Sequence, residues 1–166
     1  MISFIDLQSQ FKRIQPELEE RVIAVLRSGQ YILGPEVASF EQKLAEFAKV
    51  KHAVACSSGT DALMIALMAK GIGPGDAVFT TPFTYFATAE VIALLGATPI
   101  FVDIDISTFN IDPAALNAAI IALMECDTKN NVLPKWPIEK LRGLTPKGII
   151  TVDLFGLPAD HERINT

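Results

Sequence analysis

The chain has 166 residues, half of them hydrophobic and a fifth charged, a composition typical of a globular domain with a buried core. Its net charge is −5 and no basic stripe is present, which argues against a nucleic-acid partner. We expect a cytoplasmic protein without a membrane partner, because no apolar run is long enough to span a bilayer, no signal peptide is evident, and Cys56 and Cys126 fit no pairing motif.

Two amphipathic helices are predicted at the start of the chain. The first has apolar residues at helical spacing, namely Ile14, Leu18, Val22 and Leu26. Gly29 ends this helix, and Gly34-Pro35 precedes the second, whose apolar positions are Val37, Phe40, Leu44 and Phe47. We therefore expect an N-terminal helical segment over 1–50, followed by the front part of an α/β domain over 51–166.

From residue 52 onward, short apolar runs alternate with helical patterns. Strands are predicted at 52–56, 77–80, 98–102 and 148–152. Helices are predicted at 59–70, 87–95 and 112–124, the last with Asp112 as N-cap and Pro113 as first helical residue. This alternation predicts an α/β fold, a mostly parallel sheet with helices on both faces.

Two further segments break the alternation. Residues 125–147 are polar, contain three prolines and show no period, which predicts a long surface insertion. A last helix is predicted to start at Pro158-Ala159-Asp160, and Thr166 ends it within two turns. We therefore expect the chain to be the front part of a longer protein.

Ligands of parallel sheets bind beyond the carboxyl ends of the strands, where three polar loops are predicted, 57–60, 81–85 and 103–105. In the first loop, Ser58, Gly59 and Thr60 open a helix whose free N–H groups favour an anion, and phosphate is the usual one. Asp61 complements the helix dipole, and its carboxylate would have to point away from a phosphate. The alternative is a plain Ser/Thr cap on a buried helix.

The second loop carries Phe83, Tyr85 and Phe86. Tyr85 is the candidate to stack on a flat ring, while Phe83 and Phe86 are expected in the core. A phosphate beside a planar ring suggests a nucleotide or a phosphorylated pyridine, and the alternative is that all three rings serve packing. In the third loop, Asp103 and Asp105 favour a turn into the Asp112 cap over a metal site, so no metal ligand is predicted.

Five stretches, read together, carry a family resemblance. They are SGQYILGPEVASFE (28–41), SSGTDAL (57–63), GIGPGDAVFTTPFTYFATAE (71–90), GATPIFVDID (96–105) and VDLFGLPAD (152–160). In this order they resemble the DegT/StrS group of sugar-nucleotide aminotransferases, which has the type I pyridoxal-phosphate fold. Within that group, PFTYFATAE is most similar to enzymes that aminate UDP-linked 3-keto-hexuronic acids for surface polysaccharide.

The resemblance implies pyridoxal 5′-phosphate as cofactor. Its phosphate would lie at Gly59 and Thr60, with Ser58 adjacent, and its ring would lie on Tyr85. The loop that contains Tyr31 and Gly34 would lie near the active site at a homodimer interface, and the alternative is that this loop merely bridges two helices. The implied substrates are a nucleotide-linked keto-sugar and an amino-acid donor, expected to be glutamate.

The resemblance also implies a Schiff-base lysine in a Ser-x-x-Lys segment that would follow residue 166. We reject the string Ser9-Gln10-Phe11-Lys12, because it opens the N-terminal helix. No catalytic residue is therefore expected in this chain, which alone is expected to be inactive. Two alternatives remain: a pyridoxal-phosphate-dependent sugar dehydratase of the same fold, with histidine in place of the lysine, and a non-catalytic ligand-binding or regulatory domain.

Overall fold

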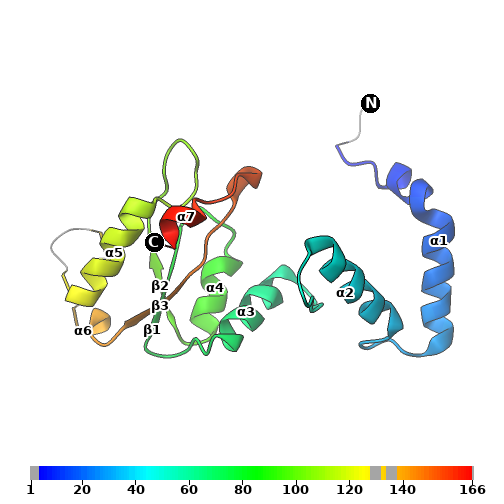
Figure 1. Ribbon diagram of the computed structural model, residues 1–166, viewed down its shortest axis with the longest axis horizontal. Helices are drawn as coiled ribbons and strands as arrows, with labels where there is room; N and C mark the ends of the chain where they lie inside the picture. The colour runs from blue at the N-terminus through cyan, green and yellow to red at the C-terminus, as the bar shows by residue number, and fades with distance from the viewer. Residues whose placement is uncertain (1–3, 128–131, 134–137, 166) are drawn as a thin grey trace. The chain divides into compact units, whose positions relative to one another are not determined.

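The computed structural model describes residues 4–127, 132–133 and 138–165 (Figure 1). The chain divides into two compact units, Met1–Ala55 and Cys56–Thr166, and each is described by itself. None of the helices in the described ranges is both long and apolar enough to cross a membrane.

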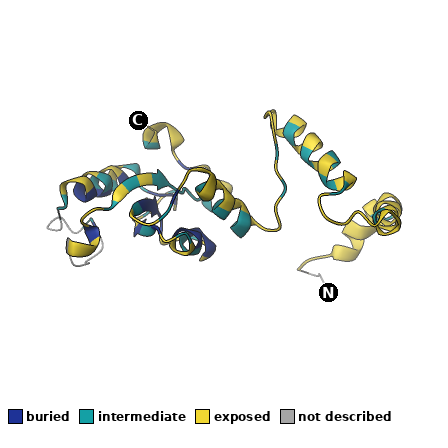
Figure 2. Ribbon diagram, turned by 90° about the horizontal axis from the view of Figure 1, so that it is seen from below, coloured by how far each residue is buried: buried dark blue, intermediate teal, exposed yellow. Residues whose placement is uncertain are grey.

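The first unit consists of α1 (Leu7–Ser28) and α2 (Pro35–Ala48), as the periodicity predicts. Asp6 caps α1, because its carboxylate accepts a hydrogen bond from the amide of Ser9 at 3.0 Å. Gly29 ends α1 in the left-handed region, at a φ of 69°. Neither helix contains a buried residue, and the apolar stripe of α1 and most of the stripe of α2 stay exposed (Figure 2).

The second unit contains the sheet. In chain order its elements are α3 (Gly59–Ala69), β1 (Asp76–Thr80), α4 (Ala87–Leu94), β2 (Thr98–Phe101), α5 (Pro113–Glu125), α6 (Ile138–Leu141), β3 (Thr145–Ile149), the 3-10 turn η1 (Leu154–Gly156) and α7 (His161–Ile164). The described strands are parallel and lie in the order β2-β1-β3. The predicted parallel α/β fold is confirmed.

The central strand β1 separates two apolar clusters, because successive side chains of a strand point to opposite faces. Ala77 and Phe79 pack with Leu116 and Leu123 of α5 on one face. Val78 packs with Val91 and Ile92 of α4 on the opposite face, and Leu63, Met64 and Leu67 of α3 pack against that cluster. Helices therefore cover both faces of the sheet, α5 one face and α3 and α4 the other (Figure 1).

One predicted strand is wrong. Residues 52–56 have no regular secondary structure, and no described strand pairs with them. The amide of Ala55 instead donates to the carboxylate of Glu41 at 2.7 Å. An apolar run becomes a strand only where a neighbouring backbone completes its hydrogen bonds, and here a side chain takes that place.

The predicted surface insertion over 125–147 is also wrong in part. The last predicted strand begins three residues early, because Thr145 pairs with Asp76 and the pairing shifts between Ala77 and Val78. Leu133 and Leu141 are buried in the core beside α5. Within this segment, residues 128–131 and 134–137, Trp136 among them, lie outside the described ranges.

Candidate functional site

The start of α3 is built as an open helix end. Ser58 is the N-cap, and its hydroxyl oxygen accepts a hydrogen bond from the amide of Asp61 at 3.1 Å. In the described part of the chain, the amides of Gly59 and Thr60 have no acceptor. Gly59 is exposed, and a Cβ atom added to it would meet nothing within 4 Å. Two N–H groups at the positive end of a helix dipole are therefore left without an acceptor among the described residues.

A carboxylate lies next to these amides. Asp61, in the first turn of α3, accepts a hydrogen bond from the hydroxyl of Ser57. A negative charge in the first turn complements the helix dipole, and it also repels any anion that approaches the amides of Gly59 and Thr60. The turn therefore combines donors for an anion with one opposing charge.

Tyr85 lies between β1 and α4, and 81% of it is exposed. Its carbonyl oxygen accepts from the amide of Thr88 at 3.1 Å, which joins the loop to the start of α4. Phe83 and Phe86 are also exposed, so the expectation that they belong to the core is wrong. The ring of Tyr85 is thus free to cover a ligand.

The predicted cofactor residues lie at the starts of two helices that pack together. Leu63 of α3 packs against the cluster that holds Val91 and Ile92 of α4. Among the described residues, no hydrogen bond or ring contact joins Tyr85 directly to the turn at 58–60. The two parts of the candidate site are therefore linked through helix packing.

Tyr31 and Gly34 lie in the loop between α1 and α2 of the first unit. The hydroxyl of Tyr31 donates to the carbonyl of Leu26 at 3.1 Å, which folds the loop back onto α1. A Cβ atom at Gly34 would collide with the carbonyl oxygen of Gln30, so only glycine fits there. Residues 29–34 line a hollow of about 430 Å³, which is open to solvent.

The third loop forms the predicted turn into the Asp112 cap. One carboxylate oxygen of Asp105 accepts from the amides of Ser107 and Thr108, at 2.7 and 3.2 Å, and from the hydroxyl of Ser107. These bonds, led by the Ser107 hydroxyl, lower the pKa of Asp105. The carboxylate of Asp112 accepts from the amide of Ala114 at 2.8 Å and so caps α5, which confirms the predicted cap.

Sequence reasoning did not select Asn110, a buried polar residue that joins two loops. Its side chain donates to the carbonyls of Leu157 and Pro158 and accepts from the amide of Leu154. Asparagine is common in turns, so the type of residue alone gave no signal.

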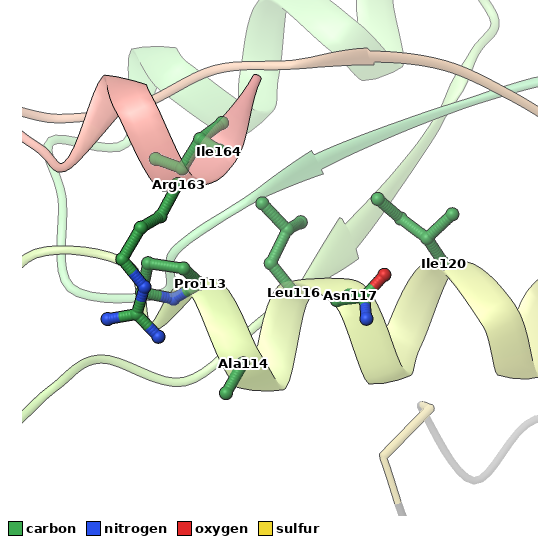
Figure 3. Close-up of a pocket in the computed structure, with 7 residues that line it drawn as sticks. All are labelled: Pro113, Ala114, Leu116, Asn117, Ile120, Arg163 and Ile164. Atoms are coloured by element: carbon green, nitrogen blue, oxygen red, sulfur yellow. The ribbon is translucent and has the colours of Figure 1, made fainter. Parts of the chain in front are cut away.

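A larger hollow, of about 550 Å³, lies between α5 and α7. Figure 3 shows Arg163 and Ile164 of α7 on one side of it, and Leu116, Asn117 and Ile120 of α5 on the other. The residues that line it include none of the predicted cofactor residues. The open helix end at Gly59 is therefore separate from this hollow.

Comparisons with known proteins give the chain a family. Residues 12–166 match the DegT/DnrJ/EryC1/StrS aminotransferase family. The chain is 47% identical to a UDP-2-acetamido-2-deoxy-3-oxo-D-glucuronate aminotransferase of Pseudomonas aeruginosa. This match covers 99% of this chain and 40% of that protein.

Solved structures agree with this match. A DegT DnrJ EryC1 StrS aminotransferase from Brucella abortus superposes with a TM-score of 0.84 at 48% identity, over 99% of this chain and 40% of that one. DesV of S. venezuelae, in complex with a ketimine intermediate, superposes with a TM-score of 0.78 at 31% identity, over 99% and 38% of the two chains. The chain thus spans about 40% of the length of such relatives. With matches that extend over nearly all of its length, the chain belongs to the DegT/DnrJ/EryC1/StrS aminotransferase family.

Proposed function

We propose that this chain supplies the phosphate-binding turn and one wall of the cofactor pocket in a pyridoxal-phosphate-dependent aminotransferase. The observation that carries the proposal is the pair of open amides at Gly59 and Thr60. Membership of the family supports the class of enzyme. The name of the P. aeruginosa relative supports a nucleotide-linked keto-sugar as substrate. A relative in Bacillus subtilis that is named as a spore coat polysaccharide biosynthesis protein supports surface polysaccharide as the destination of the product.

The residues at the start of α3 fit a phosphate group. Two unpaired N–H groups and the helix dipole attract a dianion, and the hydroxyls of Ser58 and Thr60 add donors. Because nothing lies within 4 Å of a Cβ position at Gly59, a phosphate oxygen has room to approach the backbone there. For this contact the carboxylate of Asp61 has to remain turned toward Ser57, as it is in the structure.

Tyr85 is proposed as the residue that covers the cofactor ring. Its exposed phenol offers an aromatic face, and offset stacking on another planar ring is favourable by about 0.5–1.5 kcal/mol. When bound, pyridoxal phosphate supplies the electron sink that amino transfer requires. The role of this chain's residues is to bind and orient that group.

The cofactor-linking lysine is assigned to the family's Ser-x-x-Lys segment and not to Lys12. Ser9, which begins the chain's own Ser-x-x-Lys string, lies in the first turn of α1, where its amide and hydroxyl both donate to Asp6. This string therefore belongs to the start of α1, which Asp6 caps. We further propose glutamate as the amino donor, a cytoplasmic location, and a homodimer in which the loop with Tyr31 and Gly34 contributes to the interface.

Binding of pyridoxamine 5′-phosphate tests the cofactor site without requiring a lysine. In calorimetric titrations we expect this compound to bind and pyridoxamine, which lacks the phosphate, to bind at least about tenfold more weakly. Gly59→Glu should abolish binding, because it fills the open space with a negative charge. Ala114→Glu, which places the same charge in the first turn of α5, is the matched control. Equal affinity for both compounds would contradict the proposal.

A chimera tests the reaction. In it, this chain replaces the matched 40% of the P. aeruginosa aminotransferase. With glutamate and the UDP-linked 3-oxo-glucuronate, we expect an amino sugar and 2-oxoglutarate. The dehydratase alternative is distinguished by the residue at the position of the Schiff-base lysine, where histidine would favour it. Cofactor binding without turnover, in a chimera that folds, would favour the ligand-binding alternative.

A further inference from the structure

Three phenylalanine rings meet at the carboxyl edge of the sheet. Phe83 follows β1, Phe109 follows β2, and Phe155 follows β3. The ring centroids of Phe83 lie 5.9 Å from Phe109 and 6.4 Å from Phe155, and those of Phe109 and Phe155 lie 5.7 Å apart, edge to face. These distances are those of favourable aromatic pairs, so the three rings form one contact between three loops. We call them the ring cluster.

The backbone at two of these rings is strained. Phe109 has a φ of 61° and Phe155 a φ of 54°, in the left-handed region that bulky residues rarely adopt. Such strain persists only where the surrounding structure over-determines it, and it gathers at functional sites. Phe155 is 80% exposed, so burial of its ring does not account for the strain.

The side chain of Asn110 makes the hydrogen bonds that keep Phe109 and Phe155 in these strained conformations. Its side chain is buried, at 4% exposure, and joins the loop after β2 to the loop after β3. Its amide nitrogen donates to the carbonyls of Leu157, at 2.9 Å, and Pro158, at 3.1 Å, while its oxygen accepts from the amide of Leu154 at 3.3 Å. These bonds bracket Phe155, and Phe109 is the chain neighbour of Asn110. The amide thus fixes both strained rings relative to each other.

The ring cluster acts on the loop that carries Tyr85. Phe83 stands two residues before Tyr85, and its amide donates to the hydroxyl of the buried Thr81 at 3.1 Å. The hydroxyls of Thr84 and Thr88 lie 2.8 Å apart and join the loop to α4. The ring of Phe83 adds the contact that ties this loop to the loops after β2 and β3.

We infer that Asn110 and Phe155 are positioning residues, which hold the loop at 81–86 so that Tyr85 stays poised over the cofactor ring. This inference rests on the role proposed above for Tyr85. Neither residue needs to touch the cofactor, because both act through the ring of Phe83. The loop should therefore lose order when the ring cluster is broken, while the sheet stays intact.

Backbone ¹⁵N relaxation of the chain tests the first step. In Phe155→Ala and Asn110→Ala we expect the order parameters of residues 83–86 to fall from about 0.85 to about 0.6, while those of β1 stay unchanged. Phe155→Tyr should retain the order, since it keeps the ring. Phe47→Ala and Asn117→Ala, at exposed positions on α2 and α5, are the matched controls. Unchanged order at 83–86 in both variants, with β1 intact, would overturn the inference.

Affinity for pyridoxamine 5′-phosphate tests the second step. Phe155→Ala should weaken binding by about threefold or more, and the same change should have no further effect in a Tyr85→Ala background. Equal weakening in both backgrounds would show that Phe155 does not act through Tyr85. Suppose that residues 83–86 lose order in Phe155→Ala, but that the unaltered chain does not bind pyridoxamine 5′-phosphate. The proposed function then fails, while the inference that Phe155 orders this loop stands. If the unaltered chain binds and neither measurement changes in Phe155→Ala, the proposed function stands and this inference fails.

Discussion

The hydroxyl of Ser57 donates a hydrogen bond to the carboxylate of Asp61 at the open start of α3. This pair keeps a negative charge beside the amides of Gly59 and Thr60, which are the proposed phosphate donors. The charge stabilises the helix and opposes an anion at the same time. The two effects can be separated by removing the charge alone.

Asp61→Asn should therefore raise the affinity for pyridoxamine 5′-phosphate and lower the stability of the chain. We expect about fivefold tighter binding, since removing one like charge near a phosphate is worth on the order of 1 kcal/mol. The loss of the dipole interaction should lower the free energy of unfolding by about 0.3–1 kcal/mol. Calorimetric titration and urea unfolding measure the two effects. Glu125→Gln, at the far end of α5, is the control, and weaker binding in Asp61→Asn would contradict this account.

Gly34→Ala should weaken the hydrogen bonds of the first turn of α2. The added Cβ collides with the backbone oxygen of Gln30, and the loop has to move, which weakens the bonds from the amides of Val37 and Ala38 to the carbonyl of Gly34. The overpacking should cost about 1–3 kcal/mol. Hydrogen exchange at Val37 and Ala38 should become faster by NMR. Gln30→Ala retains the backbone oxygen and should leave this exchange unchanged.

Leu141→Ala should destabilise the second unit strongly. Leu141 is 0% exposed and belongs to the core cluster beside α5, although the sequence predicts a surface segment there. Truncating a fully buried leucine costs about 2–5 kcal/mol. The adjacent Arg142 is exposed, and Arg142→Ala should change the free energy of unfolding by about 0.5 kcal/mol or less. Equal midpoints of the two variants in urea unfolding would refute the burial of Leu141.

Ser107→Ala should raise the pKa of Asp105 toward its ordinary value of about 3.9. In the folded chain the Ser107 hydroxyl lowers this pKa most, followed by the Ser107 amide, with smaller effects from the Thr108 amide and the charge of Arg163. Since the folded-state pKa is the lower one, the stabilisation is complete above the ordinary value and is lost as the pH falls through the folded-state pKa. A carboxyl NMR titration measures the shift. Ser107→Thr retains the hydroxyl and should keep the pKa low.

Local features were readable from the sequence alone. Asp112-Pro113 predicts the start of α5, Gly29 predicts the end of α1, and the run at 77–80 predicts β1, because caps, glycine conformations and apolar periodicity act within a few residues. The Ser-Gly-Thr turn likewise predicts an open helix start, and the structure has one. These features require no information about distant parts of the chain.

Contacts between distant segments were decided by the tertiary structure. The run at 52–56 is apolar, but no described strand pairs with it. The strand β3 begins at Thr145 because that residue pairs with Asp76 of β1. Leu141 is buried because it packs in the core cluster beside α5. Asn110 joins loops that lie more than 40 residues apart in the sequence. A sequence specifies the hydrogen bonds of a helix within the helix itself, whereas strands, cores and loop contacts depend on which segments meet in space.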